Sequence, residues 1–156
     1  MNEILRRVHT EIFVPNGLKL TNFKEESESQ EYGACRFDLN EKKIICRNAK
    51  ITPKKAGQFV TFWKRNRAGI IEPLHENDPI DYFLVNVTSD ISEGQFIFPK
   101  AILVKNGIIS TNKKEGKRAF RVYPSWDKVN SKQAEKTQKW QLDYFYDAHE
   151  QSDIIF

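Results

Sequence analysis

The chain has 156 residues, 39% of them hydrophobic and 12% aromatic, which is enough for the core of one ordinary domain. With 7 glycines and 6 prolines it falls outside the collagen-like and disordered classes. The longest apolar runs, such as 101–104, are far shorter than the ~20 residues that span a bilayer, and segment 1–9 is too charged for a signal peptide. We therefore expect one domain over 1–156, located in the cytoplasm and without a membrane partner.

The N-terminal part of the chain predicts a helix and then a β-hairpin. Asn2 can cap a helix that reaches Ile12, with 15–17 as its stop signal. The polar segment 24–30 is typical of a loop or a short solvated helix. Segments 32–39 and 42–51 then form the two strands of the hairpin.

The hairpin register places Cys35 opposite Cys46, so a cross-strand disulfide is conceivable. In a cytoplasmic chain, two reduced thiols that serve as small core side chains are favoured. In this register Cys35 shares the core face with Phe37. The opposite, largely charged face is expected to carry Ala34, Arg36, Asp38, Lys43, Ile45 and Arg47.

The rest of the chain predicts further strands and a closing helix. Strands are expected at 58–64, 81–87, 95–98 and 117–123, and the third of them must stop at Pro99. Segment 100–105 fits either a helix or a strand continuation. A final helix capped by Asn130 or Ser131 is expected to reach about 148. The fold class is α+β, with a mixed, largely antiparallel central sheet flanked by N- and C-terminal helices.

Positive charge is sorted along the chain, although the net charge is only +4. Segment 42–71, the first basic block, has nine basic residues and no acid, and segment 94–126, the second basic block, has seven and one acid. The acidic stretch 68–99 has six acids and no lysine or arginine. If the two blocks converge in space, their self-repulsion is relieved by a polyanion, which favours the phosphate backbone of DNA or RNA as partner.

The candidate nucleic-acid contacts are basic residues of these blocks and of the hairpin, together with two aromatic residues that could stack on unpaired bases. Trp63 is a weaker stacking candidate, and core packing is the alternative for each aromatic. The candidates are Arg36, Arg47, Lys50, Lys54, Lys55, Lys64, Arg65, Lys100, Lys113, Lys114, Lys117, Arg118, Arg121, Tyr123 and Trp126.

Most catalytic chemistries find no support in the sequence. There is no glycine-rich phosphate loop and no nucleophile elbow. The histidines lack a second ligand at metal spacing, so no metal site and no cofactor are expected; they are His9, His75 and His149.

One constellation has the layout of a Mg²⁺-dependent nuclease. Asp81 begins one strand and Lys100 follows the end of the next, where carboxylates would hold the metal and the lysine would stabilise charge. The pattern requires an acid two residues before the lysine, and Phe98 stands there. Asp38 or a glutamate within 25–31 would have to substitute, so we do not expect an enzyme.

Three phrases of the sequence resemble the MepB-like family. They span 49–63, 94–100 and 120–127 and include Gln-Phe-Ile-Phe-Pro-Lys and Arg-Val-Tyr-Pro-Ser-Trp. The resemblance covers about 32–140. Members of this family are small bacterial cytoplasmic proteins with no firmly assigned enzyme activity. In some genomes they are encoded beside a multidrug efflux pump and its repressor.

The resemblance implies a fold related to the restriction-endonuclease architecture and a nucleic-acid-binding activity. Polar or aromatic residues inside the matched phrases are the candidate functional positions: Lys50, Lys100, Arg121, Tyr123, Trp126 and Asp127. Three functions therefore stay open. They are a non-catalytic, largely sequence-independent nucleic-acid-binding protein, a Mg²⁺-dependent nuclease, and an interaction or sensor protein linked to multidrug efflux.

Overall fold

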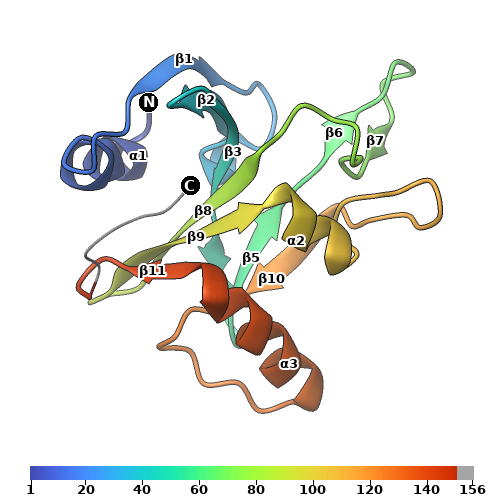
Figure 1. Cartoon of the computed structure of the whole chain (residues 1–156). Helices are drawn as coiled ribbons and strands as arrows, with labels where there is room; N and C mark the ends of the chain where they lie inside the picture. The colour runs from blue at the N-terminus through green and yellow to red at the C-terminus, as the bar shows by residue number, and fades with distance from the viewer. Residues whose placement is uncertain (151–156) are drawn as a thin grey trace.

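A computed structural model describes residues 1–150 and shows an α+β fold built on a six-stranded mixed sheet (Figure 1). The strand order is β1-β2-β3-β8-β9-β11, and every neighbouring pair is antiparallel except β3 with β8. This confirms the predicted mixed, largely antiparallel sheet. Its strands are β1 Leu20–Glu25, β2 Cys35–Leu39, β3 Lys42–Asn48, β8 Tyr82–Thr88, β9 Glu93–Pro99 and β11 Phe145–Asp147.

A three-stranded sheet packs on one face of the larger sheet, on the side opposite the N-terminal helix (Figure 1). Its strand order is β10-β5-β4. The central position of β5 agrees with its sequence, which is apolar on both faces of the strand. A two-stranded hairpin extends the chain beyond β5. These short strands are β4 Lys50–Ile51, β5 Gln58–Thr61, β6 Lys64–Arg65, β7 Ile71–Glu72 and β10 Ala119–Val122.

The N-terminal helix forms as predicted. The Asn2 side chain accepts a hydrogen bond from the Leu5 backbone N–H at 2.9 Å and caps α1, Glu3–Val8. The helix continues as a π-helical turn over His9–Phe13 and ends before Gly17, whose φ is +69°. Over residues 1–150, no helix is both long and apolar enough to cross a membrane.

The alternatives after Pro99 resolve to a helix, α2 Lys100–Lys105. The final helix is capped by Ser131 but spans only α3 Lys132–Gln141, so the predicted extension to 148 was wrong. After a 3₁₀ turn the chain forms β11 instead, because Phe145 packs on Phe96 with ring centroids 4.7 Å apart. Burial of an aromatic residue on the sheet edge outweighs local helix propensity.

Segment 24–30 also departs from expectation, since its first residues belong to β1 rather than to a loop. The strand carries few apolar residues and a register shift between Thr21 and Lys24, so it lacks the clean alternation that identifies a strand. The 3₁₀ turn Gln30–Tyr32 follows before β2.

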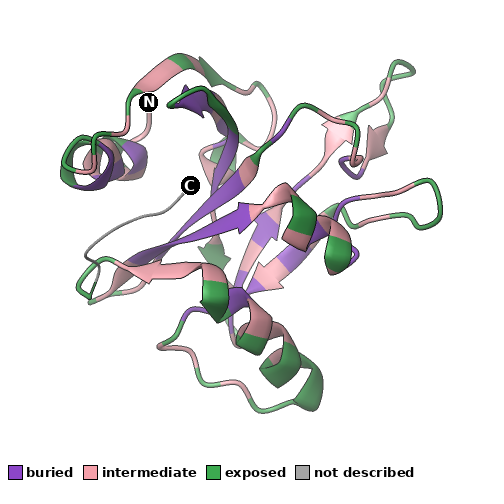
Figure 2. Cartoon of the chain, viewed as in Figure 1, coloured by how far each residue is buried: buried purple, intermediate pink, exposed green. Residues whose placement is uncertain are grey.

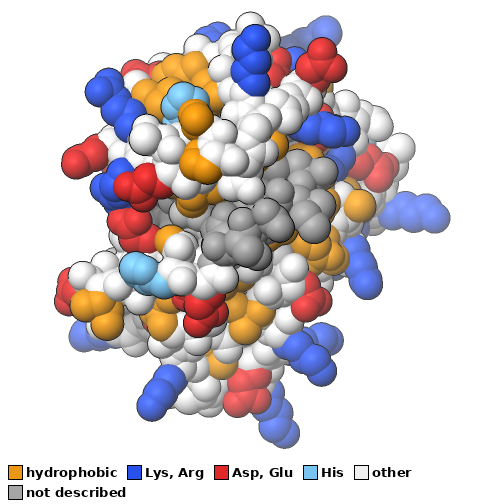
Figure 3. Space-filling view, turned by 60° about the vertical axis from the view of Figure 1, so that its left-hand side comes forward, with side chains coloured by type: hydrophobic (Ala, Val, Ile, Leu, Met, Phe, Trp, Pro, Cys, Tyr) orange, Lys and Arg blue, Asp and Glu red, His pale blue; other side chains and the backbone are white. Residues whose placement is uncertain are grey.

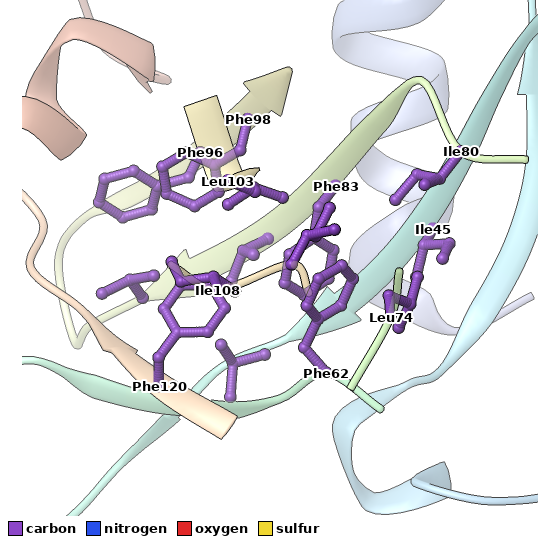
Figure 4. Close-up of a cluster of buried hydrophobic side chains, with 14 of the residues drawn as sticks. Ile45, Phe62, Leu74, Ile80, Phe83, Phe96, Phe98, Leu103, Ile108 and Phe120 are labelled. Atoms are coloured by element: carbon purple, nitrogen blue, oxygen red, sulfur yellow. The ribbon is translucent and has the colours of Figure 1, made fainter. Parts of the chain in front are cut away.

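Two hydrophobic cores lie on the two faces of the six-stranded sheet (Figure 2). The first core, between the two sheets, is rich in phenylalanine, and Phe62 of the smaller sheet's layer stacks on Phe83 of β8 with centroids 4.1 Å apart (Figure 4). The second core lies under α1 and contains Leu5, Phe13, Phe37, Leu84 and Ile97.

The cysteines belong to the second core. Cys35 pairs with Cys46 in the β2–β3 register, as predicted, and both are buried and free. The pKa of the Cys46 thiol is raised well above its usual value. The larger cause is its hydrogen bond with the Cys35 thiol, and the second is burial. The expectation of reduced core thiols is confirmed.

Replacing Phe62 tests how far the fold depends on the contact between the sheets. Because the ring is fully buried and stacked on Phe83, Phe62→Ala should lower the free energy of unfolding by about 3–5 kcal/mol. Urea denaturation measures this loss. Ile91→Ala is the control, since Ile91 is 86% exposed and should shift stability by no more than about 0.5 kcal/mol. Equal losses in the two variants would contradict the assignment.

Candidate nucleic-acid interface

The pairing of β5 with β10 joins the two basic blocks in one sheet. Lys50 and Arg121 both pair with Phe59, so the three residues lie level across β4, β5 and β10. Val60 and Phe120 of the next row are buried in the first core, and alternation along a strand therefore turns Lys50, Phe59 and Arg121 to the other side. We call that side the outer face, defined by Lys50, Phe59, Thr61, Ala119 and Arg121.

The basic turn, residues 52–57, leads from β4 into β5 and is held by Arg121. The guanidinium donates hydrogen bonds to the carbonyl oxygens of Ala56 at 3.3 Å and Gly57 at 3.4 Å, and to the Thr52 hydroxyl. Arg121 is half-buried and engaged within the protein, so its direct role is to position the turn. Lys54 and Lys55 are exposed on the turn it supports.

Gly57 completes the turn in a conformation that a side chain would disturb. Its φ is +79°, and an added Cβ would lie 2.6 Å from the Tyr123 ring and 2.8 Å from the Val122 carbonyl oxygen. Its backbone N–H donates a hydrogen bond to the Asp127 carboxylate. Burial raises the pKa of Asp127, and this effect is larger than the lowering by the Gly57 hydrogen bond. Phrases 49–63 and 120–127, far apart in sequence, thus meet at one turn.

Two neighbouring aromatic rings lie on this side of the sheet, Phe59 on the outer face and Tyr32 from the turn before β2. Tyr32 lies against Phe59 with ring centroids 6.4 Å apart, and the Lys50 ammonium lies 4.6 Å from the centre of the Tyr32 ring. Both rings are half-buried. Sequence reasoning did not single them out, because alternation in strand 58–64 separates Phe59 from Val60 without showing which of the two faces solvent.

The two tryptophans considered as stacking candidates are half-buried and have partners within the protein. Trp126 packs against the first core, with its ring 5.6 Å from that of Phe145. Trp63 has the Arg65 guanidinium 5.5 Å from its ring centre. The predicted stacking role therefore has a weaker structural basis at both positions than at Phe59 and Tyr32.

Arg47 corrects one predicted contact, because it is only 2% exposed and cannot reach a phosphate outside the protein. Segment 26–32 crosses the supposedly charged face of the hairpin and places Glu26 between Arg47, at 3.0 Å, and Arg36, at 2.6 Å. Burial lowers the pKa of Arg47, and the Glu26 carboxylate opposes that shift. Ile45 on the same face is buried in the first core.

Other candidate cations have carboxylate partners of their own. Lys64 lies 2.7 Å from Asp78 and 3.6 Å from Glu72, both in the acidic stretch. Arg65 pairs with Glu28 at 2.6 Å, and Arg118 pairs with Glu115 at 3.0 Å. These exposed or half-buried pairs leave the arginines and the lysine less available to a polyanion than the sequence suggested.

Six candidate lysines are exposed and have no carboxylate within ion-pair distance among residues 1–150: Lys50, Lys54, Lys55, Lys113, Lys114 and Lys117. The basic turn precedes β5, and loop 110–118 precedes β10, so the antiparallel pairing places them at opposite ends of the outer face. In Figure 1 this loop projects on the same side as the β6–β7 hairpin. By contrast, Figure 3 shows the side with α1 and β11, where acidic and basic side chains are interspersed.

The nuclease candidates sit at neighbouring strand ends but are engaged with the backbone. An Asp81 carboxylate oxygen accepts a hydrogen bond from the Lys43 backbone N–H at 2.8 Å, and the Lys100 ammonium donates to the Asp78 carbonyl oxygen. Asp38 accepts from Asn22 at 2.8 Å and pairs with Lys43, and these hydrogen bonds lower the pKa of Asp38. Residues 1–150 contain no group of three His, Cys, Asp or Glu side chains that could hold a metal ion.

Comparison with known proteins places the chain in a family. The MepB-like family model matches residues 26–147. The chain belongs to the MepB-like family. A crystal structure of MepB has 35% sequence identity to this chain and superimposes on it with a TM-score of 0.84. The match covers 97% of this chain and 100% of the MepB chain. No curated protein sequence matches the chain.

The matched region contains the basic turn, the outer face and the segment around Glu26. Lys50, Arg121 and Asp127, which the resemblance implied, meet at or beside the outer face, whereas Lys100 lies at the start of α2 on the Asp78 carbonyl. The family phrases therefore build more than one part of the fold.

Alanine at Gly57 tests the packing of the basic turn, and Gly69 supplies a matched control. Both glycines have a φ of +79°, but an added Cβ at Gly69 would meet no atom within 4 Å. Gly69→Ala should therefore cost about 1–2 kcal/mol from backbone conformation alone, and Gly57→Ala about 1–3 kcal/mol more from the clash with Tyr123 and Val122. Thermal or urea unfolding gives both values, and equal losses would refute the close contact.

Proposed function

We propose that this protein binds DNA or RNA through the phosphate backbone, largely without sequence preference and without catalysis. The observation that carries the proposal is the β5–β10 pairing, which arranges unpaired lysines of both basic blocks along one three-stranded sheet. The proposed surface comprises the outer face, the basic turn and loop 110–118. Its cations include Lys50, Lys54, Lys55, Lys113, Lys114 and Lys117.

The character of these cations supports sequence-independent binding. Lysine ammonium groups on exposed, flexible side chains neutralise phosphates but do not read bases, and phosphate contacts carry no direct sequence information. The bidentate readers of guanine are arginines, and those of this surface are engaged elsewhere: Arg121 holds the basic turn and Arg118 pairs with Glu115.

The absence of catalysis is supported by the way Asp81 and Lys100 are used. Each already bonds the backbone, and no third metal-binding side chain joins Asp81 among the described residues. The proposal includes the finer assignment that the fold is a relative of the restriction-endonuclease architecture that has kept nucleic-acid binding. It also includes action in the bacterial cytoplasm, where nucleic acid is the abundant polyanion.

Binding should weaken steeply with salt. If about five phosphates are neutralised on a duplex, the logarithm of affinity falls with the logarithm of salt at a slope near −4.5, or several hundredfold between about 50 and 200 mM. Fluorescence anisotropy with labelled DNA and RNA of mixed sequence measures this slope. Failure to bind either nucleic acid at the lowest salt would end the proposal.

Two double variants that remove equal charge locate the surface. Lys54→Ala/Lys55→Ala should reduce the salt slope by about two and weaken binding at low salt at least tenfold. Lys19→Ala/Lys42→Ala removes two exposed lysines beside the β2–β3 turn, at the opposite end of β3 from the basic turn. This control should keep most of the affinity. A similar loss in both variants would show that net charge, rather than this surface, governs binding.

A cleavage assay separates binding from nuclease activity. Plasmid and single-stranded substrates incubated with Mg²⁺ or Mn²⁺ should stay intact, because Asp81 and Lys100 have backbone partners rather than a metal ligand set. Cleavage that disappears in both Asp81→Ala and Lys100→Ala would establish the nuclease instead.

A further inference from the structure

Strand β10 has one edge that no strand among residues 1–150 pairs with, because β10 is the end strand of its sheet. The Phe62 backbone N–H donates a hydrogen bond to the Arg118 carbonyl oxygen at 2.8 Å. In an antiparallel pair this directs the peptide groups of Arg118 and of every second residue after it toward β5. The peptide groups of Ala119, Arg121 and Tyr123 therefore point to the opposite edge.

A glutamine of α3 covers half of this edge. The Gln141 side chain is 0% exposed, accepts a hydrogen bond from the Tyr123 N–H at 2.8 Å and donates one to the Arg121 carbonyl oxygen at 2.9 Å. A side-chain amide has the donor and the acceptor of a peptide group, so Gln141 takes the place of a residue in a neighbouring strand. Among residues 1–150, three groups of the edge have no hydrogen-bond partner: the Ala119 N–H, the Ala119 carbonyl oxygen and the Arg121 N–H.

A groove lies between β10 and α3, which are neighbours in Figure 1. Its volume is about 270 Å³, and its walls include Lys117 and Phe120 on one side and Thr137 and Trp140 on the other. Gln141 joins the two walls where it bonds the end of β10. An extended peptide suits this site, because it presents N–H and carbonyl groups at the spacing of a strand and can add to a free sheet edge.

The three free groups match the hydrogen-bond pattern of a parallel strand. In a parallel pair, one residue of the added strand donates to the Ala119 carbonyl oxygen and accepts from the Arg121 N–H. The residue two positions earlier in the added strand accepts from the Ala119 N–H. An antiparallel strand would have to pair both groups of Arg121 with a single residue, and Gln141 already bonds the carbonyl oxygen.

Charge indicates what kind of peptide would bind. Lys117 and Arg121 contribute to the groove, and no aspartate or glutamate is among the described residues that line it. A second copy of the chain does not suit the edge, since two-fold symmetry makes the pair antiparallel and sets Lys117 opposite the same basic charges. A phosphate backbone has no donor for the Ala119 carbonyl oxygen. We propose that the free edge of β10 binds an extended acidic peptide of a partner protein as an added parallel strand, an activity beyond nucleic-acid binding and independent of it.

Two peptides of equal charge test strand addition. The probe is a fluorescein-labelled peptide of alternating glutamate and valine, and its analogue is methylated on every backbone nitrogen. The analogue keeps the carboxylates but donates no backbone hydrogen bonds, so anisotropy titrations should show it binding at least about tenfold more weakly. Equal affinity for the two peptides would leave only charge attraction and would overturn the proposal.

Protein variants locate the added strand. Ala119→Pro removes a free N–H without touching the β5–β10 hydrogen bonds, since proline is tolerated where the N–H faces away from the sheet. It should weaken binding of the probe at least about tenfold. Lys117→Glu leaves the backbone intact and should weaken binding about threefold or more. The matched control is Lys19→Glu, an exposed lysine before β1, which should not change the affinity. Losses of the same size in the two lysine variants would contradict binding at this edge.

Amide hydrogen exchange measured by NMR on the unaltered protein tests the register even if Ala119→Pro does not fold. The Ala119 and Arg121 amides should exchange at least about tenfold more slowly with saturating probe, whereas the Tyr123 amide, already bonded to Gln141, should change little. No binding of the probe up to about 1 mM, or no slowing of the two amides, would overturn the proposal. Slowing by an oligonucleotide and not by the probe would instead assign the edge to nucleic acid and would also overturn it.

Discussion

The face-to-face packing of the two sheets is the contact on which the rest of the structure depends. Phe62 stacks on Phe83, and the surrounding phenylalanines exclude water from the space between β5, β8 and β9. Because side chains alternate along a strand, the burial of Val60 and Phe120 in the core turns Lys50 and Phe59 to the opposite side of the smaller sheet. The exposed cationic side is therefore a consequence of hydrophobic burial on the opposite side.

Arg121 links this packing to the charged surface. It stands on β10 inside the second basic block, yet its hydrogen bonds hold the carbonyl groups of a turn that carries the lysines of the first block. By donating hydrogen bonds to these carbonyl oxygens, Arg121 stabilises a turn whose exposed lysines repel each other. The sequence alone makes Arg121 look like one more phosphate ligand, and its geometry makes it a positioning residue.

Acidic residues decide which cations remain available. Glu26 forms ion pairs with two arginines, and Lys64 forms an ion pair with Asp78 of the acidic stretch. Folding therefore pairs some of the basic residues with acidic residues from which they are separated in sequence. The expected convergence is partial: the lysines along the β4-β5-β10 sheet stay free among the described residues, while Arg47 becomes an interior residue. Contacts between distant segments determine which cations stay unpaired, and counts of charge along the chain cannot predict this.

Local sequence determined the elements whose signals are local. The Asn2 cap, the β2–β3 register with Cys35 opposite Cys46, the stop of β9 at Pro99 and the family itself all follow from residues near one another in the chain. Tertiary structure alone decided that β11 replaces the end of a helix and that Arg47 is buried. It also decided that Phe59 lies on the side of β5 that faces away from the first core, whereas the half-buried Trp126 packs against that core. Each of these depends on which distant element covers a given face, and hydrophobic burial is a property of the assembled layers rather than of any one segment.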